Sequence, residues 1–163
     1  KNADVVVKEQ EAVIKTDDIK DNYIRESKIM LLASVLYKKT DKLTEISGLF
    51  TANDELSELY RFLVEKINNN KDYTVSSLFD NFEISDGSLI DKVINYVFPN
   101  KEVFETYLNE TILRIKIYDL ERKKEEIKAK LPNCNSTEEQ YVYLAEMQEI
   151  EKQIKRLKNG TNW

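Results

Sequence analysis

The chain has 163 residues, which is the size of one domain or of one domain with an appendage. It is 41% hydrophobic and 34% charged, has a net charge of −5, and contains only three Gly and two Pro. This shortage of turn-forming residues, together with abundant Lys, Glu, Leu and Ile, predicts an all-α protein. The chain begins with Lys1 rather than Met, which is typical of a fragment or a processed domain.

The composition excludes several kinds of site. The chain contains no His, so a His-based catalytic triad, an imidazole proton shuttle and a His-ligated metal are all excluded. A single Cys cannot form a disulfide framework, a cysteine-rich zinc site or an iron–sulfur cluster. Three scattered Gly cannot build a phosphate-binding loop. We therefore expect neither a cofactor nor a metal in this chain.

Charge and hydropathy limit the possible partners. No apolar run approaches the ~20 residues needed to cross a bilayer, and no signal peptide is recognisable. The net charge of −5 disfavours broad attraction to nucleic acid or to anionic membranes. We therefore expect a cytoplasmic protein without direct nucleic-acid or membrane binding.

The beginning of the chain divides into an irregular part and a helical part. Residues 1–21 carry short apolar clusters among charged residues but show no sustained period, which predicts a linker arm. From Tyr23 onward the apolar residues follow the period of a helix. Between Met30 and Leu36 this helix is almost entirely apolar, as expected of a central core element.

Shorter helices are expected next. Apolar residues spaced three and four apart predict a short amphipathic helix over residues 43–50 and a longer one after a cap at Asn53 or Asp54. Thr74 is expected to cap a further short helix. The apolar stripe of the longer helix consists of Leu56, Leu59, Tyr60, Leu63 and Ile67.

The last of these helices precedes a proline. Ser85 or Asp86 can begin it, and Val97 is expected on its apolar stripe. Pro99 should end it, because the residue before a proline is pushed out of the α region.

Two long helices complete the chain. Asn100 is suited to cap a helix over residues 101–131, which Pro132 ends. Ser136 or Thr137 can begin the second helix, since each has Glu or Gln three residues later, the pattern of a capping box. The second helix is expected to extend almost to the end of the chain.

Matching apolar stripes predict that the two long helices pack together. Their apolar residues alternate at spacings of three and four, which is typical of a two-helix seam, and the short turn between them makes the pair an antiparallel hairpin. The stripe of the first helix is Leu113, Ile117, Leu120, Ile127 and Leu131, interrupted by Lys124. The stripe of the second helix is Tyr143, Met147, Ile150, Ile154 and Leu157.

These elements predict three regions: a linker arm at 1–21, a helical bundle at 22–112 and a helical hairpin at 113–163. A lone hairpin buries little apolar surface relative to the entropy lost in ordering it, so such an appendage is often completed by a partner. Coiled-coil dimerisation of the hairpin, and hence weak self-association, is the alternative.

The carboxylate pairs on this chain do not resemble catalytic groups. They lie in polar, helical or linker contexts where solvated faces are usual, whereas general acid–base catalysis needs a carboxyl in a shaped, partly dry cleft. The pairs are Asp17–Asp18, Glu125–Glu126 and Glu138–Glu139.

The order of these segments resembles the C-terminal helicase-binding domain of bacterial DNA primase (the DnaG type), over roughly residues 24–160. The segments that carry the resemblance are ESKIMLLASVLYK, LFTANDELSELYRFLVEKI, TVSSLFDNFEI, ILRIKIYDLERKKEEIKAKL and EMQEIEKQIKRLKNG. None of them is a catalytic signature, and the likeness lies in pattern, element order and length.

The resemblance implies a compact helical bundle followed by a long connecting helix and a helical hairpin. It also implies a non-catalytic role: docking on the N-terminal domain of the replicative DnaB-type helicase, which recruits primase to the replication fork and modulates primer synthesis and unwinding. In that family the hairpin supplies most of the affinity. Zinc and divalent metal belong to other domains of the primase, so no cofactor is expected here.

We expect the hairpin to contact its partner through surplus apolar residues near the turn. These residues are Ile127, Leu131, Tyr141, Val142 and Leu144. Three alternatives remain open at this point: the N-terminal domain of the helicase itself, a self-associating helical-hairpin protein, and a single-stranded DNA binder, for which little binding is expected.

Overall fold

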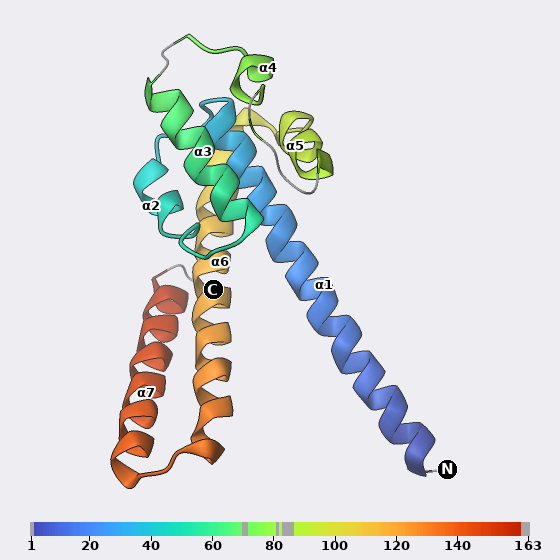
Figure 1. Ribbon diagram of the computed structural model, residues 1–163, viewed down its shortest axis with the longest axis vertical. Helices are drawn as coiled ribbons and strands as arrows, with labels where there is room; N and C mark the ends of the chain where they lie inside the picture. Colours follow the sequence, from blue (N-terminus) through green and yellow to red (C-terminus); the bar gives the residue numbers. More distant parts are fainter. Residues whose placement is uncertain (1, 70–71, 81, 83–86, 161–163) are drawn as a thin grey trace. The chain divides into compact units, whose positions relative to one another are not determined.

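The computed structural model describes the backbone of residues 2–69, 72–80, 82 and 87–160, and the side chains of these ranges from residue 19 onward. Within this part of the chain the protein is all-α, as predicted, and contains no strand (Figure 1). None of the helices described there is long and apolar enough to span a bilayer. The helices are α1 (Asn2–Leu36), α2 (Leu43–Ser47), α3 (Glu55–Asn69), α4 (Val75–Leu78), α5 (Gly87–Ile94), α6 (Lys101–Lys130) and α7 (Thr137–Asn159), with a 3-10 turn, η1 (Leu131–Asn133).

The chain divides into two compact units, Lys1–Leu108 and Asn109–Trp163. This division falls within α6, four residues before the boundary expected between bundle and hairpin.

The first helix is longer than expected. The linker arm expected over residues 1–21 is instead helical from Asn2 and continuous with the rest of α1. Neither Gly nor Pro occurs between Lys1 and Leu36, so no residue in this stretch breaks the backbone hydrogen bonding, and a helix can continue without an apolar period.

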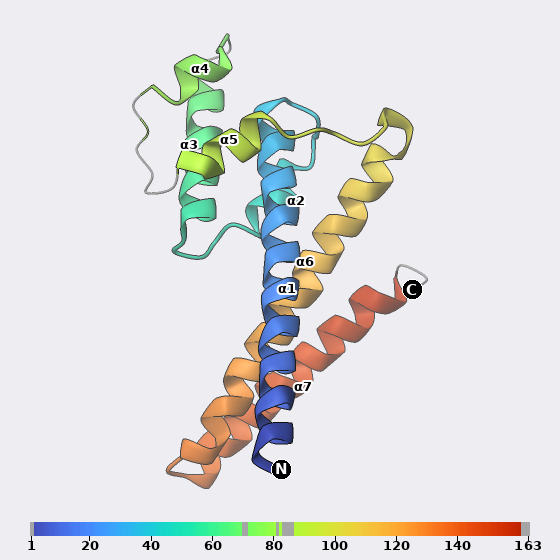
Figure 2. The same ribbon diagram turned by 90° about the vertical axis from the view of Figure 1, so that its right-hand side faces the viewer.

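The C-terminal half of α1 is the centre of the bundle unit. As predicted, it is buried on all sides: the exposed fractions of Met30, Leu31 and Leu32 are 1%, 0% and 0%. Helices α3 and α5 both lie against it (Figures 1 and 2). Ser34 is also fully buried, and its hydroxyl donates to the carbonyl of Leu31 at 2.6 Å, so no polar group is left without a partner there.

Helix α1 ends in a Schellman motif built without glycine. The amide of Lys38 donates to the carbonyl of Val35 at 3.3 Å, and that of Lys39 donates to Ser34 at 2.8 Å. Lys38 occupies the left-handed position, with φ 54°. Its ammonium lies 5.0 Å from the ring centre of Tyr73, whose hydroxyl donates to the carbonyl of Leu36 at 2.7 Å.

Helix α3 begins at one of the two predicted caps. The Asp54 carboxylate accepts a hydrogen bond from the amide of Ser57 at 2.8 Å, which satisfies a donor that the helix leaves free. Tyr60 of α3 stacks on Phe50 with ring centres 4.7 Å apart. Phe50 lies beyond the end of α2 at Ser47, so the helix predicted over residues 43–50 is shorter than expected.

The predicted cap at Thr74 is confirmed as a capping box. Its hydroxyl accepts from the amide of Ser77 at 3.1 Å, and the Ser77 hydroxyl accepts from the amide of Thr74, also at 3.1 Å. The helix it begins is a single turn. Beyond it, the rings of Phe79 and Phe82 both stack on Phe62 of α3.

Helix α5 ends earlier than predicted. The caps expected at Ser85 or Asp86 lie outside the described residues, and the helix ends at Ile94 rather than at Pro99. The hydroxyl of Tyr37 donates to the carbonyl of Ile94, which gives this last carbonyl of the helix a hydrogen-bond partner. Val97 is therefore not on an apolar stripe but 85% exposed.

The Asp54 cap makes the stability of the bundle unit depend on pH. Partial burial raises the pKa of Asp54, but the hydrogen bonds from Ser57 and the charges of Lys28 and Arg61 outweigh it, so the pKa lies below 3.8. Because this pKa is lowered on folding, its stabilisation is complete above 3.8 and is lost as the pH falls through the lower folded-state value.

We therefore expect Asp54→Asn to keep the cap but lower the free energy of unfolding at pH 7 by up to about 1 kcal/mol. The difference from the unsubstituted protein should shrink on acidification, because Asp54 then also becomes neutral. Urea unfolding followed by circular dichroism, across the acid range in which the protein stays folded, measures both effects. A difference that stays constant with pH would contradict this assignment.

Candidate protein-docking site

The hairpin unit is built on helix α6, which begins at the predicted residue and ends one residue before the predicted end. The Asn100 side chain accepts a hydrogen bond from the amide of Glu102 at 3.1 Å. The helix gives way at Leu131 to the turn η1, because Pro132 has no amide hydrogen to continue the helical hydrogen bonding.

The second hairpin helix, α7, begins at Ser136, one of the two predicted caps. The Ser136 hydroxyl accepts from the amide of Glu139 at 3.1 Å. The Glu139 carboxylate reaches back to the amide of Asn135 at 3.4 Å and also receives the hydroxyl of Tyr143 at 3.5 Å. This network fixes the direction in which α7 leaves the turn.

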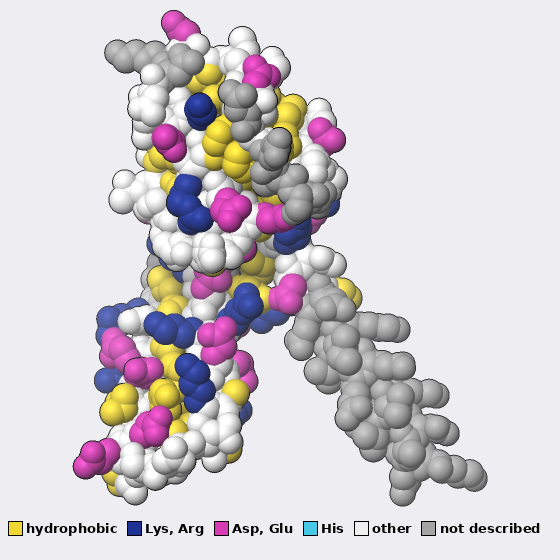
Figure 3. Space-filling view, in the orientation of Figure 1, with side chains coloured by type: hydrophobic (Ala, Val, Ile, Leu, Met, Phe, Trp, Pro, Cys, Tyr) yellow, Lys and Arg dark blue, Asp and Glu magenta, His cyan; other side chains and the backbone are white. Residues whose placement is uncertain are grey.

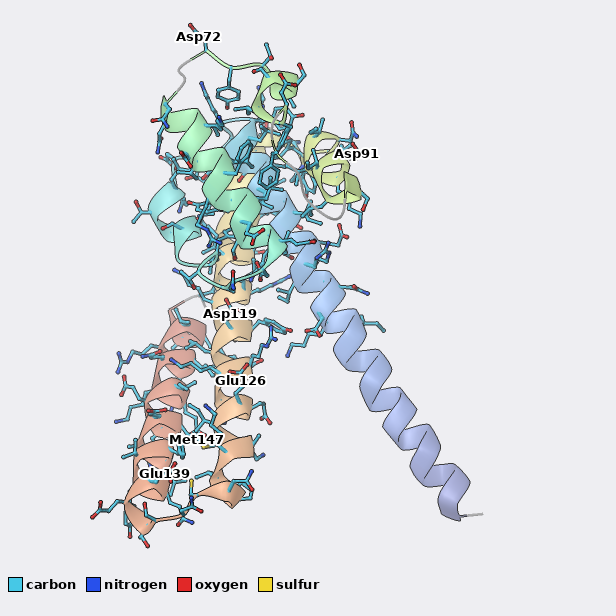
Figure 4. The ribbon with its side chains drawn as sticks, viewed as in Figure 1. Asp72, Asp91, Asp119, Glu126, Glu139 and Met147 are labelled. Atoms are coloured by element: carbon cyan, nitrogen blue, oxygen red, sulfur yellow. The ribbon has the colours of Figure 1, made fainter. Side chains whose placement is uncertain are left out.

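The seam between α6 and α7 forms as predicted. The five predicted residues of the α7 stripe are its buried or half-buried residues, together with Gln153, and every other residue of α7 is exposed. Ile127 of α6 and Ile150 of α7 are the most buried of the predicted seam residues near the turn, each with an exposed fraction of 5%. The helices lie side by side in Figure 1, and Figure 4 marks Met147 on α7.

Two ion pairs fix the register of the hairpin. Lys124 lies 2.9 Å from Glu151, and Lys158 lies 3.9 Å from Glu121. Lys124 interrupts the apolar stripe of α6, and this ion pair explains its place: the ammonium leaves the seam to meet the carboxylate of Glu151, whose hydrogen bond raises the pKa of Lys124. Exposed pairs of this kind add little stability, but together they define an antiparallel register.

Three of the predicted docking residues are exposed on α7. The exposed fractions of Tyr141, Val142 and Leu144 are 68%, 56% and 44%. At 100° per residue, Tyr141 points directly away from the seam and the other two flank it. In Figure 3 the hairpin face shows hydrophobic side chains among acidic and basic ones.

The other two predicted docking residues are placed differently. Ile127 is buried within the seam, so it is wrong as a member of a docking surface: a partner cannot reach it without opening the hairpin. Its position on the apolar stripe of α6 already predicts burial. The face of the helix on which a side chain lies, and not its distance from the turn, decides whether a partner can reach it. Leu131 is half-buried in η1, at the turn of the hairpin.

A shallow concavity beside the turn was not predicted. Its volume is about 530 Å³, and it is lined by both helices and the turn. The Tyr143 hydroxyl donates to the Glu139 carboxylate, and removal from water and the charge of Glu139 raise its pKa. No sequence pattern indicates this concavity, because the path of the turn brings its lining together. The lining residues are Glu126, Ala129, Lys130, Asn133, Glu139 and Tyr143.

In the part of the chain that the structure describes, no three Asp, Glu or Cys side chains are grouped so that they could hold a metal ion. Comparisons with protein-family models, with curated proteins and with solved structures found no match for this chain.

The seam generates a stability prediction for the hairpin. We expect Ile150→Ala to destabilise the hairpin by about 2–5 kcal/mol, because it removes a buried side chain and leaves a cavity. Val142→Ala, on the exposed side of the same helix, should change stability by less than about 0.5 kcal/mol. Hydrogen exchange of the α7 amides measures both. Equal exchange in the two variants would show that Ile150 does not hold the helices together.

Proposed function

We propose that this chain is a non-catalytic adaptor domain whose hairpin docks on the N-terminal domain of a replicative helicase and recruits primase to the replication fork. The observation that carries the docking role is the apolar group Tyr141, Val142 and Leu144, exposed on α7 although the seam of the hairpin is already filled. The identity of the partner rests on the resemblance of the segment order to the helicase-binding domain of primase.

The composition of the exposed group supports protein binding. Tyr is enriched among the residues that dominate binding energy, since it offers a large amphipathic surface and loses few rotamers when it is fixed. A Val or Leu side chain gains about 1.5–3 kcal/mol when it is fully buried. Tyr141, Val142 and Leu144 therefore offer enough apolar surface to anchor one edge of an interface.

The polar side of the hairpin tip supports a role without catalysis. Glu126 and Lys130 beside the concavity are exposed, and the concavity is open to water. General acid–base catalysis depends on a carboxyl or amine whose pKa is shifted in a partly dry cleft. The open setting of these groups favours contact with another protein over reaction with a small substrate.

The N-terminal domain of the helicase itself is the competing identity, because the resemblance implies a similar bundle in both proteins. The two differ in what surrounds the domain in the gene. A polymerase core encoded before Lys1 would support the adaptor, and a phosphate-binding loop encoded after Trp163 would support the helicase.

We expect Tyr141→Ala combined with Leu144→Ala to weaken binding to the helicase N-terminal domain more than tenfold, which corresponds to more than about 1.4 kcal/mol. Isothermal titration calorimetry of the two purified proteins measures the affinity. Val97→Ala combined with Val103→Ala, which truncates exposed apolar side chains of the bundle unit, is the matched control and should bind normally.

Two results would count against this proposal in different ways. Unchanged affinity of the Tyr141 and Leu144 variant would remove these residues from the interface. No binding by the unsubstituted chain would exclude the helicase domain as the partner.

A further inference from the structure

Helix α7 ends in an Asn-Gly pair, Asn159–Gly160. A glycine at such a position usually ends the helix in the left-handed conformation, which other residues rarely adopt. Gly160 instead has φ −71° and ψ −4°, in the right-handed region that any residue adopts. The Cβ of an alanine at this position would lie 3.4 Å from the carbonyl oxygen of Arg156, which is an ordinary contact. The conformation of the backbone therefore does not explain the glycine.

An Asn-Gly pair is the sequence in which asparagine loses ammonia most readily. The backbone nitrogen of the glycine attacks the side-chain carbonyl carbon of the asparagine, and the glycine has no side chain to hinder this approach. The new C–N bond closes a succinimide ring, and the side-chain nitrogen leaves as ammonia with the proton of the glycine amide. Water then opens the ring at either carbonyl and leaves aspartate or isoaspartate, so the reaction needs no co-reactant other than water.

The last turn of α7 holds this pair in an unreactive geometry. Asn159 is the last residue of the helix, and a helical side chain leans towards the N-terminus of its helix, away from the backbone nitrogen that follows it. The amide of Gly160 donates to the carbonyl of Arg156 at 3.0 Å, so its proton is held in a hydrogen bond. Asn159 is exposed to the water that completes the reaction. Ring closure therefore requires the last turn to open.

Contacts with α6 oppose this opening. Leu157, in the same turn as Asn159, is half-buried in the seam, and Lys158 lies 3.9 Å from Glu121 of α6. The ends of helices open at a lower free energy than their middles, so a single packed side chain has a large share in keeping the last turn closed. The exposed ion pair adds little to this.

We propose that Asn159 is a site of slow, spontaneous deamidation, and that the packing of Leu157 in the seam sets its rate. The product carries a negative charge at the C-terminal end of α7, where the helix dipole disfavours it. Isoaspartate also adds a methylene group to the backbone, which interrupts the helical hydrogen bonding. The modification therefore weakens the last turn of the hairpin irreversibly. It lies about 27 Å along the helix from Tyr141, at a rise of about 1.5 Å per residue, so it is independent of docking on the helicase domain.

Peptide mapping by mass spectrometry tests this inference on the full chain incubated at neutral pH. An unstructured peptide of residues 155–163 gives the rate without the helix. We expect Asn159 to react at least about fivefold more slowly in the chain than in the peptide, which corresponds to about 1 kcal/mol. Leu157→Ala should bring the rate towards that of the peptide. Val142→Ala, on the exposed side of the same helix, is the matched control and should leave the rate unchanged.

A second substitution tests the chemistry separately from the packing. Gly160→Ala keeps the right-handed backbone but hinders the attacking nitrogen, so it should slow the loss of Asn159 in the chain and in the peptide alike. Equal rates in the unsubstituted chain and the peptide would overturn the proposal, because the helix would then give no protection. A Leu157→Ala variant that is folded by circular dichroism and reacts as slowly as the unsubstituted chain would also overturn it.

Discussion

The seam between α6 and α7 decides what the hairpin can do. A helix turns 100° per residue, so it can hold only one stripe against its neighbour. Once Ile150 is buried against α6, the geometry of α7 forces Tyr141 to the opposite side. The exposed aromatic ring is therefore a direct consequence of the packing that holds the hairpin together.

The bundle unit follows a different principle, in which one helix is buried by its neighbours. The C-terminal half of α1 is apolar all round, so α3 and α5 can pack on separate sides of it. Two hydrogen bonds join the end of this helix to segments far away in the sequence. Tyr73 donates to the carbonyl of Leu36, and the hydroxyl of Tyr37 donates to that of Ile94.

The sequence predicts the helices and the seam well because both depend on local spacing. The caps at Asp54, Thr74 and Ser136 form as expected, since a hydroxyl or carboxylate reaches the free amides of its own first turn. The end of α5 differs from the prediction because it involves a hydrogen bond from Tyr37, a residue 57 positions away. The assignment of Ile127 to a docking surface fails for another reason: the face of the helix on which a residue lies, and not its closeness to a turn, decides whether its side chain is exposed.

The two units also differ in how far apart in the sequence their contacting residues lie. The hairpin is joined by neighbouring helices across one short turn, and even its most distant ion pair, between Glu121 and Lys158, lies within a single stretch of sequence. The bundle, by contrast, includes the hydrogen bond between Tyr37 and Ile94, which lie 57 positions apart in the sequence. Since local contacts form faster than distant ones, the hairpin can fold quickly once both of its helices have been made, whereas the bundle cannot complete its contacts until the segment around Ile94 has been made.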